Sequence, residues 1–430
     1  MTTLEWTPEL LRILEIMEKT KESLFLTGRA GTGKSTLLTH FRSRTQKKTV
    51  ILAPTGVAAL NVKGETIHSF FRFGTTVTPE SALRAASKIK KTDLYEAIET
   101  LIIDEISMVR ADLFDCVDIF LRTVCKTTEP FGGKQVILIG DLMQLPPIIT
   151  RDEKQYFDDL YDTPYFFSSH VMNNPLFDCK KIEMERVFRQ QDPLFIECLT
   201  HIRNNTLTQH NLKVFNQKCY NPTFKWKEGF VLLTTTNQKA EVFNRKKLET
   251  LDGETFSKQA KLSKEFESKY APAELEVQFK IGAQVMFLNN DSSFRWVNGS
   301  IGTICAIDQD SEVAVIEVEL KTGTHVYVTT HTWELYKYKF DTEKKTVAQE
   351  KIGEFTQYPL KLAWAMTIHK SQGKTFDKVM IDLSAGAFAS GQTYVALSRC
   401  RSLEGLVLTY PLKGSHIFVD ERVKEFIDNK

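Results

Sequence analysis

Short apolar runs alternate with helix-like stretches over the first 180 residues of the chain. The runs are SLFLTG from position 23, TVILAP from 49, TLIIDE from 100 and KQVILIGD from 134. Each is bounded by turn residues and is too short for a helix of ordinary length. Continuous apolar runs that are separated by helices are typical of a parallel sheet covered on both faces. The pattern therefore predicts an α/β lobe over about residues 1–180.

A second set of such runs follows later in the chain. These runs are FVLLTTT at 230–236, LKLAWAM at 360–366, KVMIDLS at 378–384 and GLVLTYP at 405–411. They predict a second α/β lobe, made of residues 181–254 and 351–430. Residues 255–350 are instead β-rich, with turns that contain Gly or Asp, which is typical of a small antiparallel barrel. The predicted fold class is α/β, with a small antiparallel β-barrel inserted in the second of two lobes.

Composition narrows the class of protein without defining its function. A chain of 430 residues is too long for one core, and 42% hydrophobic with 26% charged residues is ordinary for a soluble globular protein. No apolar run approaches the roughly 18 residues of a membrane helix, so we expect no membrane partner. The seven cysteines are scattered without a C-x-x-C pair, which favours a reducing, cytoplasmic compartment. A net charge of +2 is compatible with nucleic acid, because a groove can be basic in a nearly neutral protein.

The segment SLFLTGRAGTGKST predicts a nucleotide site. It places a strand, a Gly-rich turn and a helix start in the order of the P-loop G-x-x-x-x-G-K-[ST]. In such a loop the backbone N–H groups surround phosphate oxygens, Lys34 neutralises phosphate charge and the Ser35 hydroxyl ligates Mg²⁺. A Gly-rich turn with a surface lysine is the structural alternative. The residues expected to bind the nucleotide are Gly28, Gly31, Thr32, Gly33, Lys34, Ser35 and Thr36.

Acidic and polar residues end two further strands. In LIIDEISM the expected strand is followed by Asp104 and Glu105, and LIGDLMQLPP places Gln144 after the next strand. We expect Asp104 to join Ser35 in the Mg²⁺ shell and Glu105 to polarise the attacking water. The amide of Gln144 suits a sensor of the γ-phosphate, because it both donates and accepts. Solvated turns are the alternative, but the carboxyl ends of parallel strands meet at one crevice. ATP and Mg²⁺ are the expected cofactors.

Phosphoryl transfer also needs positive charge on the transferred group, which arginine supplies as a planar fork. Arg189 in ERVFRQQ and Arg399 in TYVALSRCRS are the candidates, with Arg186 as a weaker competitor of Arg189. From the pattern alone, each is equally compatible with a surface arginine at the end of an element.

Taken together, the motifs resemble those of Pif-type DNA helicases, in the B-type (5′→3′) branch of superfamily one. The matching segments are GRAGTGKS, APTGVAA, TIHSFF, DEISM, GDLMQLPP, VFRQ, IHKSQGKT and GQTYVALSRCRS, in that order. The resemblance implies two RecA-like lobes with ATP between them, Arg189 and Arg399 as arginine fingers, and Gly373 beside the phosphates. The family's N-terminal glutamine, which reads adenine, has no counterpart in EWTPELL, so the preference for ATP over other triphosphates stays open.

A groove for single-stranded DNA is the next implication of the resemblance. Phosphate contacts are expected where strands end, in APTGVAAL and LLTTTNQ, and in IHKSQGKT. TIHSFF supplies an aromatic platform for bases, with burial of the segment as the alternative. The expected DNA-binding residues are Thr55, Gly56, His68, Phe70, Thr234, Thr235, Asn237, His369, Lys370 and Ser371.

TIHKSQGKTF ends like a P-loop but is not a second one, because Ile368 stands where the first glycine belongs. We expect this segment to couple the DNA track to the ATP site, with Gln372 and Gly373 turned towards the phosphates. Two weaker expectations concern THTWELYKYKF and RFGTTVTPE. In the first, alternation turns half of the rings into a core, and the lysines could line a DNA channel. The second, at 72–80, is short enough for the family's duplex-separating wedge. The basic run RAASKIKK is interpreted as a solvated helix face.

The hypothesis is an ATP-dependent 5′→3′ DNA helicase that moves on single-stranded DNA and unwinds duplex, forked or quadruplex DNA. Its partners would be single-stranded DNA and junctions of single and double strands, and we expect a monomer when DNA is absent. The lack of long flanking segments favours a bacterial or viral setting over a nuclear or mitochondrial one. An RNA-directed superfamily-one helicase and a nucleotide-switched clamp that does not translocate are the alternatives. The sequence is silent on the cellular pathway.

Overall fold

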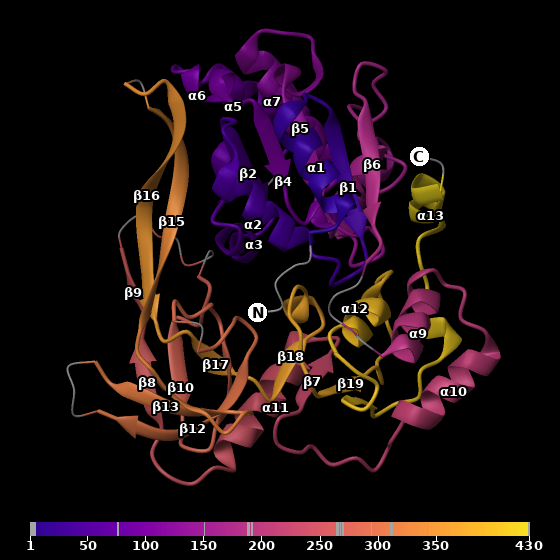
Figure 1. The fold of residues 1–430 in the computed structure, drawn as a ribbon, viewed down its shortest axis with the longest axis vertical. Coiled ribbons are helices and arrows are strands. Elements are labelled where there is room, and N and C mark those ends of the chain that lie inside the picture. The colour runs from indigo at the N-terminus through magenta and orange to yellow at the C-terminus, as the bar shows by residue number, and fades with distance from the viewer. Residues whose placement is uncertain are drawn as a thin grey trace.

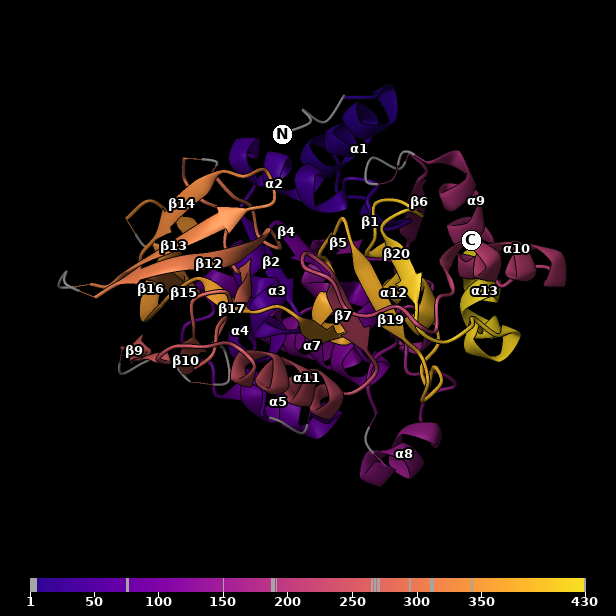
Figure 2. The same cartoon turned by 90° about the horizontal axis from the view of Figure 1, so that it is seen from below.

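The computed structural model describes residues 6–74, 77–149, 151–186, 190, 192–263, 266, 268, 271–293, 295–309, 313–341 and 343–428. The chain forms two lobes and a β-rich insert (Figure 1). Figure 2 shows strands β12–β14 of the insert on one side of the molecule and helices α9, α10 and α13 on the other. Among the described residues, no helix combines the length and the apolar content needed to cross a membrane.

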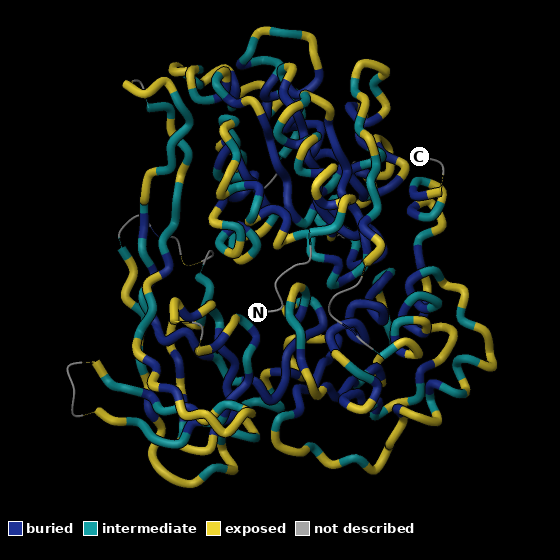
Figure 3. Tube along the Cα trace, viewed as in Figure 1, coloured by how far each residue is buried: buried dark blue, intermediate teal, exposed yellow. Residues whose placement is uncertain are grey.

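The first lobe is built on a six-stranded sheet in the order β3-β2-β4-β5-β1-β6, and its strand pairs are all parallel. The strands are β1 (Ser23–Gly28), β2 (Thr49–Ala53), β3 (Glu65–Thr66), β4 (Thr100–Ile103), β5 (Gln135–Ile139) and β6 (Cys179–Met184). The helices are α1 (Pro8–Lys19), α2 (Lys34–Arg44), α3 (Gly56–Asn61), α4 (Ile67–Phe70), α5 (Pro79–Ser87), α6 (Asp93–Ala97), α7 (Ala111–Cys125) and α8 (Arg151–Asp158). The central strands are buried on both faces, as their apolar sequences predict (Figure 3).

The second lobe has a four-stranded parallel sheet in the order β18-β7-β19-β20. Its strands are β7 (Val231–Thr234), β18 (Ala365–Thr367), β19 (Val379–Asp382) and β20 (Leu406–Leu408). The helices of this half are α9 (Pro193–Arg203), α10 (Gln209–Cys219), α11 (Asn237–Glu249), α12 (Gln392–Ser398) and α13 (Glu421–Asp428). Both lobes are therefore parallel α/β units of the RecA-like kind, which confirms the predicted fold class.

The insert is antiparallel, as predicted, and is divided into sheets of five, three and two strands in the described part of the chain. The strands are β8 (Phe256–Gln259), β9 (Lys261–Leu262), β10 (Glu276–Phe279), β11 (Gln284–Phe287), β12 (Ile301–Asp308), β13 (Val315–Leu320), β14 (His325–Val328), β15 (His331–Asp341), β16 (Thr346–Gln357) and β17 (Leu360–Leu362). The five-stranded sheet β14-β13-β12-β11-β17 and the pair β10-β8 share one hydrophobic core.

A long hairpin, β15–β16, leaves the insert and lies beside the first lobe (Figure 1). The hydroxyl of Tyr338 accepts from the N–H of Ile51 at 3.0 Å, and the Tyr338 N–H donates to Glu65 at 3.1 Å. Arg42 donates to Gln349 at 2.7 Å from the other strand. Tyr338 therefore ties the hairpin to the first lobe, while the neighbouring Lys337 and Lys339 are exposed.

The boundaries of the lobes differ from the predicted ones in three places. β6 continues to Met184 and pairs with β1, so the first lobe extends past residue 180. LKLAWAM is not one strand: β17 pairs with β11 of the insert, whereas β18 pairs with β7 of the second lobe. The insert thus reaches Leu362 rather than 350. Finally, α13 packs on the first lobe, where Phe426 stacks on Phe167 at 4.4 Å and Val423 is buried.

Candidate nucleotide site and strand-binding surface

The P-loop runs from the end of β1 into the first turn of α2. Gly28 has a φ of +147°, and a Cβ at this position would lie 2.5 Å from the carbonyl oxygen of Met184 on β6. Only glycine fits so close an approach of two backbones. Gly31 and Gly33 are also left-handed, and Thr32 between them is buried. The loop therefore has the backbone conformation that brings successive N–H groups towards one centre.

Lysine and hydroxyl side chains surround this loop. Lys34 Nζ donates to the carbonyl oxygens of Gly28 at 2.6 Å and Arg29 at 3.0 Å, so the ammonium group lies over the loop. Ser35 and Thr36 are exposed in the first turn of α2. A helix N-terminus with a lysine beside it attracts phosphate through both its dipole and its charge.

Asp104 and Glu105 form an acidic pair at the end of β4, in which Asp104 is buried and Glu105 is partly buried. Burial first, and then the neighbouring Glu105, raise the pKa of Asp104 to about 7. Burial also raises the pKa of Glu105, although Lys34 and Arg399 lower it. A divalent cation would offset this burial, and a carboxylate with the Ser35 hydroxyl offers the hard oxygen ligands that Mg²⁺ prefers. The residues present therefore fit Mg²⁺.

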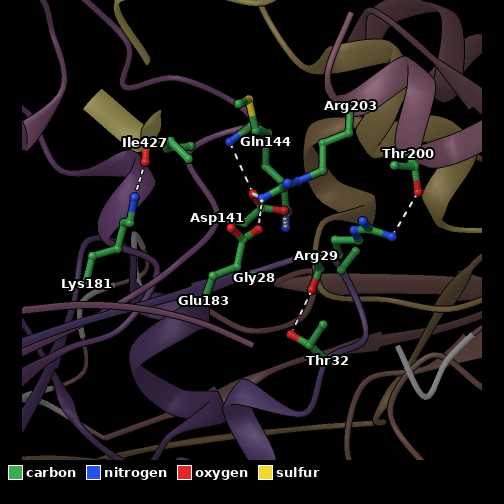
Figure 4. A network of polar contacts seen from close by, with 12 residues as sticks. Gly28, Arg29, Thr32, Asp141, Gln144, Lys181, Glu183, Thr200, Arg203 and Ile427 are labelled. Atoms are coloured by element: carbon green, nitrogen blue, oxygen red, sulfur yellow. Dashed lines mark hydrogen bonds and ion pairs between the residues drawn. The ribbon is translucent and has the colours of Figure 1, made fainter. Parts of the chain in front are cut away.

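Gln144 belongs to a polar network that reaches both lobes (Figure 4). Its Nε2 donates to Asp141 Oδ2 at 3.2 Å. The other oxygen of Asp141 lies 3.3 Å from Arg203 on α9, which also pairs with Glu183 at 3.2 Å. Arg203 is 5% exposed, so these charges compensate each other away from water. The structure thus places Gln144 beside the acidic edge of the site and links it to the second lobe.

Further hydrogen bonds join the two lobes around the P-loop. Tyr394 Oη accepts from Ala30 N–H at 3.1 Å, Thr200 Oγ1 accepts from Arg29 at 2.9 Å, and Gln372 Nε2 donates to Glu105 Oε2 at 3.4 Å. Sequence reasoning missed Tyr394 and Arg29. Both lie inside quoted motifs, GQTYVALSRCRS and GRAGTGKS, but spacing does not reveal which motif residues face the other lobe. The Gln372 contact places the second lobe directly on the acidic pair.

Arg399 is 1% exposed and directly follows α12 as its C-cap residue. Its guanidinium donates to Val395 O at 2.9 Å, Ser398 Oγ at 2.8 Å and Lys374 O at 3.2 Å. It also lowers the pKa of Glu105, so its charge acts on the acidic pair from the second lobe. The structure therefore brings Arg399 to the side of the site where an arginine finger is expected.

Two other residues, Arg189 and Gly373, were expected at the ATP site. Arg189 lies outside the described residues. Gly373 has a φ of +77° and follows Gln372 in an exposed turn, and a Cβ on it would meet nothing within 4 Å. Glycine is therefore explained here by its backbone conformation rather than by crowding.

Some of the expected DNA-binding residues lie at the surface. Thr55 is exposed and caps α3 by accepting from Ala58 N–H, with Gly56 as the first residue of that helix. Asn237 is the exposed first residue of α11, and Lys370 is exposed. His68 and His369 are partly buried, and each keeps some exposed surface.

Phe70 was expected to form an exposed platform for bases, and this expectation is wrong for this structure. The residue is 4% exposed. Its ring packs edge-on against Phe71 at 4.9 Å, Tyr95 at 5.3 Å and Tyr338 at 5.8 Å. TIHSFF forms the short helix α4, and a helix so placed turns both phenylalanines into the core of the first lobe.

The hydroxyl groups of three further residues are also buried. Thr234 is 0% exposed and donates to Thr236 O at 2.9 Å, and Thr235 is 5% exposed. Ser371 is 0% exposed and donates to Ile368 O at 2.7 Å. The hydroxyl groups of Thr234 and Ser371 each donate to a nearby backbone carbonyl group. The structure therefore does not present these buried residues to a DNA phosphate. In LLTTTNQ the exposed hydroxyl belongs to Thr236, which caps α11.

An exposed aromatic residue, Phe388, was missed. It is 63% exposed and stacks on His369 with ring centroids 5.9 Å apart and an interplanar angle of 14°. The sequence feature that could have indicated it is a single large aromatic residue among the small residues of AGAFASG, the loop that precedes α12. Its ring therefore has the exposure that base stacking requires and that Phe70 lacks.

The arrangement defines a class of protein. A P-loop, an acidic pair and a polar amide gather on one parallel α/β lobe, and an arginine and a glutamine approach them from a second lobe. This is a P-loop NTPase with two RecA-like lobes, in which the nucleotide site lies between the lobes.

Comparison with known proteins identifies the family. The family model described as PIF1-like helicase matches residues 10–212. The ATP-dependent DNA helicase Pif1 of Bdellovibrio bacteriovorus is 33% identical over 98% of this chain and 92% of its own length. The zebrafish (Danio rerio) helicase PIF1 is 35% identical over 90% of this chain, which spans 58% of that longer protein. The chain belongs to the PIF1-like helicase family, as its motifs indicated.

Solved structures agree with this assignment. Pif1 of Bacteroides sp in complex with ADP-AlF4 has a TM-score of 0.90 at 35% identity, covering 99% of this chain and 97% of that one. Bacteroides Pif1 bound to ssDNA has a TM-score of 0.69 at 34% identity with the same coverage. By these scores the present structure is more similar overall to the first complex than to the second.

The raised pKa of Glu105 gives a prediction about stability. A group whose pKa is higher in the folded protein than in the unfolded chain costs stability as the pH rises through that interval. We expect Glu105→Gln to raise the unfolding temperature of the nucleotide-free protein more at pH 8 than at pH 5, and to slow ATP hydrolysis by about 10²–10⁴-fold. Differential scanning fluorimetry at both pH values measures the first effect, with the exposed Glu404→Gln as control. A lower unfolding temperature for Glu105→Gln at pH 8 would contradict this account.

Proposed function

We propose that the protein is an ATP-dependent DNA helicase that moves 5′→3′ along single-stranded DNA and separates strands at junctions of single and double strands. The observation that carries this proposal is the contact of Gln372 with Glu105, at 3.4 Å. The segment that contains Gln372 also exposes Lys370 and places His369 beside Phe388. One short segment therefore connects a surface suited to nucleic acid with the residue that polarises water.

Closure and opening of the lobes would supply the movement. Lys34, Ser35 and Asp104 would hold ATP and Mg²⁺, and Mg²⁺ would supply positive charge against the phosphates. Arg399 would attract the phosphates from the second lobe, and by the family resemblance Arg189 would join it. Glu105 holds the attacking water and Gln144 responds to the γ-phosphate. Hydrolysis removes the shared charge, so the lobes part.

The DNA strand would cross both lobes at the N-terminal ends of α3 and α11 and along the segment that follows β18. Thr55 and Gly56 of the first lobe and Asn237 and Lys370 of the second lobe offer backbone N–H groups, an amide and an ammonium group to phosphates. Contacts of this kind do not read bases, which suits a motor that must pass any sequence.

The assembly state and setting are further proposals. We infer a monomer in the absence of DNA, supported by a nucleotide site whose two halves both come from one chain. We infer a cytoplasmic setting, supported by seven cysteines that are all free thiols. Sedimentation of the DNA-free protein tests the first inference, and a dimer at low concentration would contradict it.

Duplexes that carry only a 5′ tail or only a 3′ tail test the direction of movement. We expect ATP-dependent unwinding from the 5′ tail, because family members of this branch move 5′→3′, and no unwinding by Lys34→Ala, which lacks the phosphate charge partner. Strand separation is measured by gel electrophoresis. Unwinding from the 3′ tail alone would overturn the direction, and ATP turnover that single-stranded DNA fails to stimulate would favour a clamp. Stronger stimulation by RNA of the same sequence would favour an RNA helicase.

Phe388 provides a test of the strand path. We expect Phe388→Ala to weaken the binding of single-stranded DNA by about 1–3 kcal/mol, because a base loses its stacking partner. Fluorescence anisotropy with a labelled oligothymidylate measures the affinity. Tyr410→Ala removes another exposed ring from the second lobe and serves as the control. Equal affinities for these two variants would show that Phe388 does not contact the single-stranded DNA.

A further inference from the structure

Arg203, the last residue of α9, is a buried cation that joins the second lobe to the first (Figure 4). Its Nη2 lies 3.3 Å from Asp141 Oδ1 and 3.2 Å from Glu183 Oε1, and both carboxylates belong to the first lobe. Arg203 is 5% exposed and Asp141 is 1% exposed, whereas Glu183 keeps some exposed surface. Breaking such a pair is costly, because the remaining partner becomes an uncompensated buried charge. Asp141 therefore depends on a cation that the other lobe supplies.

The two carboxylates lie on either side of the strand that leads into the P-loop. Asp141 follows β5 and Glu183 lies on β6, and these strands are the two neighbours of β1 in the sheet. Met184, the residue after Glu183, is the one whose carbonyl oxygen would lie 2.5 Å from a Cβ on Gly28. Arg203 thus bridges both neighbours of the P-loop strand at its carboxyl end.

Asp141 sets the orientation of the Gln144 side chain. A carboxylate accepts hydrogen bonds but cannot donate them, so the end of the amide that faces Asp141 is Nε2, at 3.2 Å. Asp141 also accepts from two backbone N–H groups of the same loop, at Oδ1 from Met143 at 3.2 Å and at its carbonyl oxygen from Gln144 at 3.0 Å. Gln144 is 8% exposed. The position of Asp141 therefore decides which atoms of the amide are presented to the γ-phosphate.

A second element of the second lobe packs against the same loop. Gly391, which directly precedes α12, is buried and has a φ of +70°. A Cβ on it would lie 2.5 Å from the carbonyl oxygen of Gln144 and would also collide with that of Met143. Only glycine allows two backbones to approach so closely. Because Arg399 follows α12, the helix that leads to the expected arginine finger begins against the loop that carries Gln144.

The contacts of Arg203 are not yet at their shortest. Charged N–H donors typically lie about 2.7–2.9 Å from carboxylate oxygens, whereas both contacts of Arg203 exceed 3 Å. Its Nε is buried and has no hydrogen-bond partner among the residues that the structure describes. A guanidinium has five N–H groups, so closer approach of the lobes can shorten these contacts and add others.

We propose that Arg203 is a positioning residue for ATP hydrolysis. As the nucleotide draws the lobes together, Arg203 engages Asp141 fully, and Asp141 holds the amide of Gln144 in the orientation that the γ-phosphate requires. The proposal rests on the proposed function, in which Gln144 responds to the γ-phosphate. Arg203 acts through these two residues and does not touch the nucleotide, which distinguishes its role from that of Arg399.

A double-mutant cycle of ATP turnover at saturating single-stranded DNA tests this role. Arg203→Gln removes the cation, Gln144→Ala removes the amide, and the double variant removes both. We expect Arg203→Gln to lower kcat by about 10²-fold, as misplacement of a catalytic group does, and to change KM for ATP by less than about threefold. In the Gln144→Ala background, the same substitution should lower kcat by less than about threefold, because the amide that Arg203 positions is already absent.

Two further variants serve as matched controls. Arg203→Lys keeps the charge but lacks the planar guanidinium, so we expect a loss in kcat of about tenfold that again disappears without Gln144. Arg245→Gln removes an exposed arginine that pairs with Glu249 on α11, and it should leave kcat and KM unchanged. Unfolding temperatures verify that the variants fold. If Arg203→Gln does not fold, the cycle is measured with Arg203→Lys.

The outcomes separate this inference from the proposed function. If the unmodified protein does not hydrolyse ATP in the presence of single-stranded DNA, the proposed function fails. If it does, and substitution of Arg203 lowers kcat equally with and without Gln144, Arg203 only holds the lobes together and the proposal is overturned. An unchanged kcat in the Arg203 variant that folds would also overturn it. A rise in KM alone would assign Arg203 to nucleotide binding, which contradicts a positioning role.

Discussion

The acidic pair of Asp104, which is buried, and Glu105, which is partly buried, is the constraint on which the rest of the nucleotide site depends. Two adjacent carboxyl groups without water are costly unless positive charge is nearby, and their raised pKa values reflect that cost. Lys34 approaches the pair from the first lobe and Arg399 from the second. The acidic pair therefore attracts positive charge from both lobes and favours their approach. A bound nucleotide with Mg²⁺ would strengthen this attraction.

Connections of several kinds hold the lobes in place around that pair. Arg203 and Tyr394 reach from the second lobe to Asp141 and Ala30 near the P-loop. The β15–β16 hairpin reaches the first lobe from the insert, and α13 reaches it from the C-terminal end of the chain. Movement of the lobes is therefore constrained on opposite sides of the molecule (Figure 1), which favours a hinged closure over free rotation.

The sequence predicted the strands and the positions of the motifs well, but it did not predict side-chain direction. P-loop residues from Gly28 to Thr36 lie where the motif places them, because glycine and helix-start chemistry act locally. Phe70 and Ser371 also lie in recognisable motifs, yet burial in α4 and a local hydrogen bond turn them inwards. The division of LKLAWAM between two sheets depends on β11 and β7, both distant in sequence. Such partners cannot be inferred from periodicity alone.

The most direct test of the account is the ATP turnover of Gln372→Ala with and without saturating single-stranded DNA. Gln372 joins the proposed strand-binding segment to Glu105. Its loss should therefore leave DNA affinity in place while DNA no longer accelerates hydrolysis. Gln217→Ala, an exposed substitution on α10, serves as the control. Stimulation equal to that of the control would contradict the claim that this segment couples the track to the acidic pair.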